Sequence, residues 1–235
     1  MLVTNFKLKY SLYRVVLAAF QLFDTGRLHP MRERAIRALN KSVDYIETQM
    51  PNAIGFETKK ELLIFSLDNV NVSGYYTEFG VFSGGTIRFM AKKNPQAQFH
   101  GFDSFEGLPE AWSGTRFTKA TFTLKGKLPK VPVNVTLHKG WFSDSLPQWR
   151  QSHHDKIAFI HIDCDLYSST LDILNNLKDK LQVGTVILFD EYFNYSNWEN
   201  HEFKAWQEFI SQNNIGYQYL GFARQQVAVR ISALQ

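Results

Sequence analysis

The stretch TEFGVFSGGT (residues 77–86), followed by FHGFD (residues 99–103), determines how the rest of the chain is interpreted. An apolar run ends in an acid and a glycine, a Gly-Gly pair opens an amphipathic segment, and a second short apolar run ends in Asp103. This pattern predicts a strand, a tight turn, a helix and a second strand, which form one βαβ unit. Glycines at the turn let the backbone approach a ligand, and an acid at the next strand tip can accept two ribose hydroxyls. The stretch therefore predicts a site for a nucleoside-bearing cofactor.

The glycine spacing differs from that of dinucleotide-binding proteins. A pyrophosphate site needs G-x-G-x-x-G, but here Val81, Phe82 and Ser83 separate Gly80 from the next glycine. An acid, Glu78, precedes Gly80 by two positions, and carboxylates at a strand tip complement a cation. S-adenosylmethionine carries a sulfonium and an ammonium group but no phosphate, so it fits this pattern better. The alternative is that the glycines only make a tight strand-to-helix turn.

The composition is that of a globular protein. The chain has 235 residues, 44% of them hydrophobic and 15% aromatic, which suits a single α/β domain with an added N-terminal segment. The net charge of +4 is too small and too dispersed to predict a nucleic-acid partner. Basic residues gather near the N-terminus, where they predict a solvated helical face or, alternatively, an anionic surface. The single Cys164 is typical of a reducing compartment, so we expect a cytoplasmic protein.

An apolar segment at residues 12–23 is interrupted by Arg14 and Gln21. It lacks a small-residue cleavage site and is shorter than the roughly 20 apolar residues of a membrane span, so it predicts neither a secretory signal nor a span. We expect an amphipathic helix that packs on its own domain or on a partner subunit, with a peripheral membrane contact as the alternative.

Further helices are predicted at residues 31–50 and 58–70. Residues 1–56 are interpreted as a helical cap on a domain formed by residues 57–235, because no flexible linker separates them. A homo-oligomer through the N-terminal helices is left open. The loop-rich stretch 104–132 is expected to be a lid or an entrance wall.

Carboxylates follow two predicted strands, at residues 156–162 and 185–189. Asp163 follows the first strand, and Asp190 and Glu191 follow the second. Neighbouring strands lie about 5 Å apart, so these acids are expected to meet at the carboxyl edge of the sheet. Acids in one cleft repel unless they are protonated or bind a cation, which predicts Mg²⁺ or another divalent cation there. The alternative is that one or two of them cap helices or pair with Lys or Arg.

Three more strands are predicted at residues 133–138, 217–222 and 226–231, the last two as an antiparallel pair. This makes seven strands in all. Trp141 and Phe142 follow the strand at 133–138 and are expected either to cover an adenine ring or to pack in the core.

Four motifs in order resemble the macrocin O-methyltransferase family. They are EFGVFSGG (78–85), GFDSFEGLP (101–109), HIDCDLYSST (161–170) and FDEYF (189–193). The resemblance covers residues 58–209 and implies an α/β, Rossmann-like, seven-stranded methyltransferase sheet, mostly parallel with an antiparallel last strand and helices on both faces. Members use S-adenosylmethionine and a divalent metal to methylate sugar or aromatic hydroxyls of natural products. The same activity is implied here, with a sugar or glycosylated acceptor favoured.

The resemblance also implies roles for single residues. Asp103 would hold the ribose, the Gly80 turn the methionine part, and Asp163 with Asp190 and Glu191 the Mg²⁺. The family often has Asp or Asn where this chain has Glu191. The predicted cofactor contacts are Glu78, Phe79, Gly80, Ser83, Gly84, Thr86, Asp103, Ser104, Trp141, Phe142 and Asp163.

The expected reaction is a direct displacement, in which an acceptor oxygen attacks the sulfonium methyl and the metal lowers the pKa of that hydroxyl. Related small-molecule enzymes carry a lysine three residues after the first metal acid, where this chain has Leu166. The base is therefore expected to be Asp163, Asp165 or His161, although His161 could instead be a buried structural histidine. Acceptor contacts are predicted at Tyr192, Phe193, Tyr195, Trp198 and His201, for which core packing is the alternative.

Two other classes of function compete with this prediction. Asp163-x-Asp165 after a strand also resembles the D-x-D motif of nucleotide-sugar glycosyltransferases, but that class leaves Glu78 and Asp103 unexplained. A degenerate, non-catalytic protein could bind a partner or a membrane through residues 12–23. The intact acids at every expected position argue against it.

Overall fold

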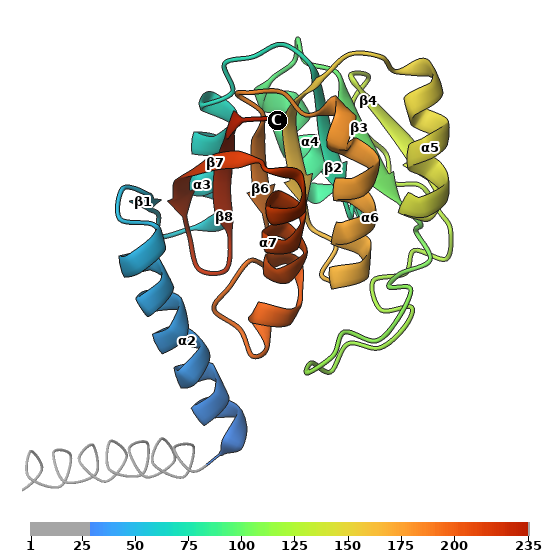
Figure 1. The fold of residues 1–235 in the computed structure, drawn as a ribbon. Coiled ribbons are helices and arrows are strands. Elements are labelled where there is room, and N and C mark those ends of the chain that lie inside the picture. The colour runs from blue at the N-terminus through green and yellow to red at the C-terminus, as the bar shows by residue number, and fades with distance from the viewer. Residues whose placement is uncertain (1–28, 235) are drawn as a thin grey trace, which may run out of the picture.

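The computed structural model describes residues 29–234, which form an eight-stranded sheet between two layers of helices (Figure 1). The strands are β1 (Ile54–Gly55), β2 (Tyr75–Phe79), β3 (Phe99–Asp103), β4 (Val135–Lys139), β5 (Ile157–Ile162), β6 (Val186–Phe189), β7 (Gly216–Phe222) and β8 (Val227–Ala233). Their order is β1-β7-β8-β6-β5-β2-β3-β4. Strand β8 is antiparallel to β6 and β7, and the other pairs are parallel. The seven predicted strands are confirmed, and Ile54–Gly55 forms a short additional strand beside β7.

The helices divide between the two faces of the sheet (Figure 1). Helices α3 (Lys59–Asp68) and α4 (Gly85–Lys93) pack on one face. Helices α5 (Phe142–Ser152), α6 (Tyr167–Leu177) and α7 (Glu202–Asn213) pack on the other. The remaining helical elements are α2 (Pro30–Gln49), η2 (Lys178–Lys180) and η3 (Trp198–Asn200).

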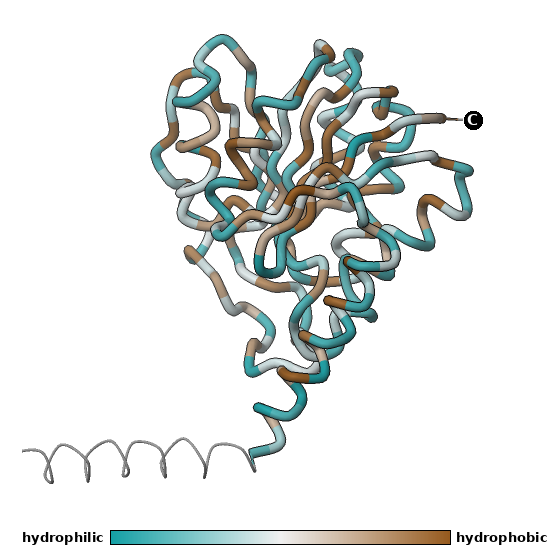
Figure 2. The backbone as a smooth tube through the Cα atoms, turned by 90° about the vertical axis from the view of Figure 1, so that its left-hand side faces the viewer, coloured by the Kyte–Doolittle hydropathy of each residue, from teal (hydrophilic) through white to brown (hydrophobic). Residues whose placement is uncertain are grey.

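The central strands β5 and β6 are buried along their whole length because helices cover both faces. This explains their nearly unbroken apolar sequence, and the brown segments of the backbone gather in the middle of the fold (Figure 2). The two strands pair in parallel with Ile162 opposite Phe189. The residues that follow, Asp163 and Asp190, therefore leave the sheet side by side.

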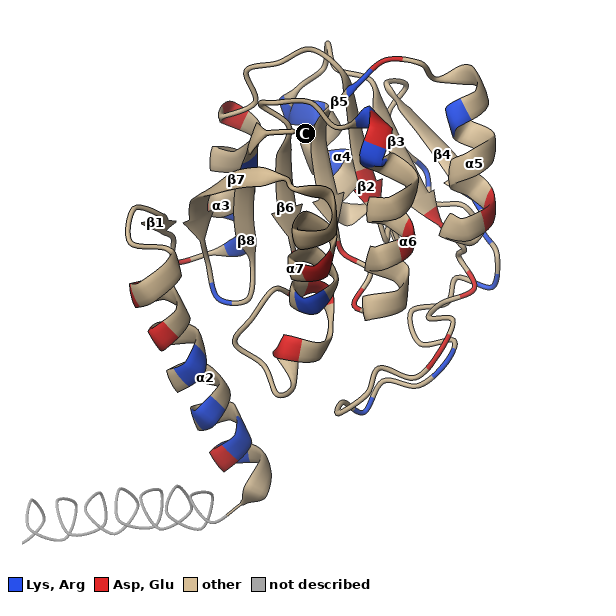
Figure 3. Cartoon of the chain, in the orientation of Figure 1, with Lys and Arg blue, Asp and Glu red and all other residues tan. Residues whose placement is uncertain are grey.

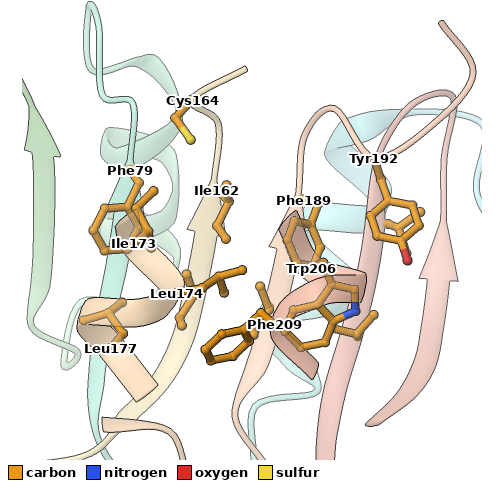
Figure 4. Close-up of a cluster of buried hydrophobic side chains, with 14 of the residues drawn as sticks. Phe79, Ile162, Cys164, Ile173, Leu174, Leu177, Phe189, Tyr192, Trp206 and Phe209 are labelled. Carbon is orange, nitrogen blue, oxygen red and sulfur yellow. The ribbon is translucent and has the colours of Figure 1, made fainter. Parts of the chain in front are cut away.

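Aromatic side chains fill the core under α6 and α7 (Figure 4). Phe79 stacks on Phe102 with ring centroids 4.9 Å apart. Trp206 from α7 packs against Phe189, with centroids 5.4 Å apart. The first contact joins the ends of β2 and β3, and the second attaches α7 to the end of β6.

The C-terminal half of α2 is attached to the domain by polar contacts. Ser42 Oγ accepts a hydrogen bond from the backbone N–H of Asn194 at 2.9 Å. The Tyr45 hydroxyl bonds to that of Tyr219, which also bonds to Tyr192 at 2.8 Å. The helix predicted at residues 12–23 lies outside the described residues. None of the helices between residues 29 and 234 has the length and apolar character that a bilayer crossing requires.

Candidate active site

The turn after β2 lies against the end of β5. Gly80 has φ +93°, and a Cβ there would lie 1.7 Å from the carbonyl oxygen of Asp163. The N–H of Asp163 donates to the carbonyl of Phe79 at 2.9 Å. Only glycine fits this position, because both the dihedral angle and the close approach exclude a side chain. The glycine therefore brings the β2–α4 turn next to the acidic end of β5.

Asp103 organises the same turn from the tip of β3. Its Oδ2 accepts from the N–H of Phe82 at 2.7 Å, and its Oδ1 accepts from the N–H of Phe105 at 2.6 Å. Burial raises the pKa of Asp103, and these backbone hydrogen bonds oppose the rise. A carboxylate oxygen can accept more than one hydrogen bond, so both oxygens keep capacity for a ligand hydroxyl. Phe82 has φ 45°, a strained value for an aromatic residue, and lies where strain often marks a ligand site.

A cavity of about 910 Å³ opens at the carboxyl ends of β2, β3, β5 and β6. The Gly80 turn, Asp103 and the acids Asp163, Asp165 and Glu191 border it together. The predicted entrance wall forms much of its remaining boundary, with Leu108, Trp112 and Phe117 among the lining residues. A cavity of this size at the carboxyl edge of an α/β sheet is typical of a small-molecule site.

Lys59 from α3 faces both acids that end β5 and β6. Its Nζ lies 2.6 Å from Asp190 Oδ2 and 3.6 Å from Asp163 Oδ2. Burial lowers the pKa of Lys59, but Asp163 and Asp190 outweigh burial, so the net shift is upward. Burial also raises the pKa of Asp190, but His161 and Lys59 outweigh it and hold this pKa well below its usual value. Asp190 is therefore ionised and held by cationic neighbours.

His161 lies beneath the cavity between two acids. Its Nδ1 is 3.0 Å from Glu78 Oε1, and its Nε2 is 3.6 Å from Asp190 Oδ1. Burial lowers the pKa of His161, but Asp190 and Glu78 outweigh burial and raise it to about 10. The ring is therefore a buried cation that orients Asp190. His161 and Glu78 do not border the cavity, which places them under the site and away from any ligand in it.

Asp163, Asp165 and Glu191 form the acidic group that does border the cavity. Each offers an oxygen within 4.8 Å of the others. Burial and the charge of Asp190 raise the pKa of Asp163 to about 7, and burial and the charge of Asp163 raise that of Asp165 to about 8. Glu191 Oε2 is buried and has no hydrogen-bond partner among residues 29–234. These carboxylates are destabilised by one another and would bind a cation strongly.

The structure brings about half of the predicted site residues to the cavity. Those that line it are Gly80, Ser83, Thr86, Asp103, Ser104, Trp141, Phe142, Asp163, Asp165 and Glu191. Those that do not are Glu78, Phe79, Gly84, His161, Asp190, Tyr192, Phe193, Tyr195, Trp198 and His201. Tyr192, Phe193 and Trp198 are instead buried in the same hydrophobic cluster as Trp206 and Phe209 of α7. Their predicted contact with an acceptor in this cavity is thus corrected to core packing.

Several cavity residues were not predicted. Phe82, Phe117 and Phe122 line it, and the rings of Phe82 and Phe122 meet edge to face at 5.8 Å. Trp112 also lines it and stacks on Phe117 at 5.7 Å. The aromatic content of the 104–132 loop was a usable signal, since exposed loops rarely carry so many rings. Lys59 gave no local signal, because its partner Asp190 is 131 residues away in the sequence.

Comparison with known proteins identifies the family. The model of the macrocin-O-methyltransferase (TylF) family matches residues 60–220. The chain belongs to this family. The D-x-D interpretation of Asp163 and Asp165 as a glycosyltransferase motif therefore has no support.

Two curated relatives come from Streptomyces. An 8-demethyl-8-(2,3-dimethoxy-alpha-L-rhamnosyl)-tetracenomycin-C 4'-O-methyltransferase of Streptomyces olivaceus is 32% identical, over 52% of this chain and 54% of the relative. A demethyldecarbamoylnovobiocin O-methyltransferase of Streptomyces niveus is 31% identical over the same shares, 52% and 54%. The chain thus spans about half the length of the curated relatives it matches.

Solved structures confirm the fold. The O-methyltransferase NovP superposes with a TM-score of 0.58 at 24% identity, covering 74% of this chain and 79% of that one. The calicheamicin methyltransferase CalS11 gives a TM-score of 0.57 at 20% identity, covering 86% of this chain and 93% of that one. The expected methyltransferase sheet, with helices on both faces, is confirmed.

Proposed function

We propose that this protein is an S-adenosylmethionine-dependent O-methyltransferase that methylates a hydroxyl of a small molecule. The observation that supports it is one cavity that touches the Gly80 turn, Asp103 and the acids Asp163, Asp165 and Glu191. A methyl donor and an activated acceptor must meet, and this cavity has groups suited to both.

The cofactor would lie between the Gly80 turn and Asp103. The free acceptor capacity of Asp103 suits the two ribose hydroxyls, and the close backbone at Gly80 leaves space for the methionine part. Trp141 and Phe142 line the same cavity at the start of α5, where an aromatic surface suits the adenine. Ser83, Thr86 and Ser104 supply further hydroxyl groups at its wall.

The acidic residues fit a hard divalent cation such as Mg²⁺. The donor set consists of carboxylate oxygens, and the buried Oε2 of Glu191 has no hydrogen-bond partner among the described residues. Asp163, Asp190 and Glu191 would hold the ion, which when bound lowers the pKa of a coordinated hydroxyl. Lys59 and His161 fix Asp190, so the cluster is oriented before a cation arrives.

Asp165 is the proposed base. It borders the cavity and has φ 67°, a left-handed conformation that turns the chain directly after Asp163. It can take the proton of the acceptor hydroxyl while the oxygen attacks the methyl group. Asp163 lies in the same group and is the alternative base, whereas His161 is out of reach of the cavity. The departing thioether is neutral and needs no acid.

The proposed acceptor is a sugar hydroxyl of a glycosylated natural product. The names of the relatives support this, since one acts on a rhamnosyl-bearing tetracenomycin and another on demethyldecarbamoylnovobiocin. The methyltransferase proposal is tested by calorimetry, which measures the binding of S-adenosylhomocysteine and, as the control ligand, of uridine diphosphate. Micromolar binding of the first supports the proposal, and binding of the second alone would contradict it.

We also propose that α2 pairs with α2 of a second copy. Ile36, Leu39 and Val43 form an exposed apolar stripe at helical spacing. The N-terminal half of α2 is mainly basic and the C-terminal half mainly acidic (Figure 3). An antiparallel pair would therefore place each basic half opposite an acidic half and bury both stripes.

For the cellular location, the single buried Cys164 supports a reducing, cytoplasmic compartment.

A further inference from the structure

A second, smaller cavity of about 320 Å³ adjoins the main one. Glu110 and Ser168 line both, so the two spaces meet at these residues. The second cavity lies between the 104–132 loop, the start of α6 and the segment around η3. It is large enough for one small ring, near the lower end of the range for ligand pockets.

His201 carries the main indication of a ligand in this cavity. The residue is 5% exposed and lines the cavity, and its Nε2 has no hydrogen-bond partner among residues 29–234. Its ring is fixed by edge-to-face contact with Trp112, at 6.1 Å between centroids, and by Tyr195 at 6.0 Å. A buried polar atom without a partner costs free energy, and a ligand hydroxyl would remove that cost.

The other lining residues indicate the chemistry of the ligand. Ser113, Asn197 and Asn200 offer hydroxyl and amide groups, and Glu110 is already oriented by a hydrogen bond from Ser168 Oγ at 2.7 Å. Among residues 29–234, no lysine or arginine lines this cavity. Burial lowers the pKa of His201 and outweighs a hydrogen bond with the backbone of Ser113, so its neutral form is favoured. A phosphate would find no cationic side chain among these lining residues, whereas the hydroxyls of a neutral sugar would find both donors and acceptors.

We propose that this cavity binds a neutral sugar ring of the acceptor, next to the ring that is methylated, and that His201 selects it through Nε2. The inference rests on the proposed methyltransferase function. It adds a location and a chemical class: the non-reacting part of the acceptor is an uncharged glycoside and carries no nucleoside diphosphate at this position.

The test is saturation-transfer NMR on the full chain, titrated with methyl α-L-rhamnopyranoside and separately with thymidine diphosphate. We expect the glycoside to bind with a dissociation constant on the order of 1–10 mM, as suits a single small ring. His201→Phe keeps an aromatic ring between Trp112 and Tyr195 but removes Nε2, and should weaken glycoside binding about tenfold. His154→Phe is the matched control, because His154 is exposed and does not line the cavity, and should leave binding unchanged.

Asn200→Ala is a second variant, because Asn200 is exposed and its change spares the core; it should weaken glycoside binding about threefold. Equal glycoside binding by the wild type and both variants would overturn the inference, as would absence of glycoside binding or displacement of the glycoside by thymidine diphosphate. S-adenosylhomocysteine binding is measured by calorimetry on the same samples. Its loss would count against the methyltransferase proposal, whereas its presence without glycoside binding would count against this cavity alone.

Discussion

Lys59 Nζ lies 2.6 Å from Asp190 Oδ2 and 3.6 Å from Asp163 Oδ2, so one lysine faces the acids that end two neighbouring strands. Lys59→Met should leave these acids poorly compensated and lower the free energy of unfolding by about 1–3 kcal/mol at pH 7, less than for a fully buried pair because Lys59 is partly exposed. Added Mg²⁺ should restore part of the loss, because a ligand of the folded state stabilises it.

Urea denaturation with and without Mg²⁺ measures this effect. Lys60→Met is the matched control, since Lys60 is the next residue on α3 and contacts the ring of Phe89 instead. Equal losses in the two variants would show that Lys59 does not act through the acids.

The carboxylate of Glu191 gives a second prediction. Glu191→Gln removes a charge from the acidic group and should weaken Mg²⁺ binding by about 10- to 100-fold in calorimetry, a loss comparable with that at other metal sites. Glu199→Gln is the control, because Glu199 pairs with Lys41 on the surface. Unchanged Mg²⁺ affinity in Glu191→Gln would remove this residue from the cation site.

The Gly80 turn gives a third prediction. In Gly80→Ala the new Cβ would meet the Asp163 carbonyl at a residue with φ +93°, so stability should fall by about 3 kcal/mol or more. Gly85→Ala is the control: a Cβ there meets nothing within 4 Å, and alanine at the start of α4 should be neutral or stabilise by up to about 1 kcal/mol. Thermal unfolding compares them, and similar melting temperatures would contradict the close approach.

Neighbouring histidines on β3 and β4 predict that the stability of the fold depends on pH. His100 Nδ1 lies 3.0 Å from His138 Nε2, and Trp149 Nε1 donates to His100. Burial and the neighbouring His138 lower the pKa of His100 to about 3. In the unfolded chain His100 takes up a proton near pH 6.5, whereas in the folded chain it stays neutral until about pH 3. The neutral, buried ring therefore contributes fully to the free energy of unfolding above pH 6.5, and this contribution is lost as the pH falls toward 3.

At pH 5 the contribution of His100 to this loss is about 1–2 kcal/mol. His100→Gln, which keeps an acceptor for Trp149, should reduce the stability difference between pH 7.5 and pH 5 by that amount. Comparing each protein with itself at two pH values separates this effect from the acids of the site, whose raised pKa values act in the opposite direction. An unchanged difference would mean that His100 is protonated in the folded state.

The exposed stripe on α2 gives a final prediction. Leu39→Glu should convert a dimer to a monomer in light scattering, because it places a charge in the centre of the proposed contact. Val183→Glu makes the same change at another exposed apolar residue, between η2 and β6, and should not. A monomeric wild type at about 100 μM would refute the pairing.

The sequence predicts the fold well because the strands of an α/β sheet are apolar runs and their ends carry turn residues. Asp163 and Asp190 were predicted to converge, and the pairing of Ile162 with Phe189 accounts for it. Helix α5 was not predicted, since Pro147 lies inside it. The division of the chain at residue 56 stays a prediction.

The site was predicted in part. Residues next to strand ends could be placed, because the sheet fixes where they emerge. The direction of a side chain could not, which is why Tyr192 was assigned to the acceptor and is instead in the core. Contacts between distant segments, such as Lys59 with Asp190, arise only from tertiary packing and leave no trace in a local pattern.

The tyrosine hydroxyls link the N-terminal helix to the acidic loop. Tyr192 immediately follows Glu191, its hydroxyl bonds to Tyr219, and Tyr219 bonds to Tyr45 on α2. A displacement of this helix would therefore pull on the chain one peptide bond away from a proposed cation ligand. Pairing of two subunits through α2 would then be coupled to the cation site, and a change in oligomeric state would change the affinity for the metal.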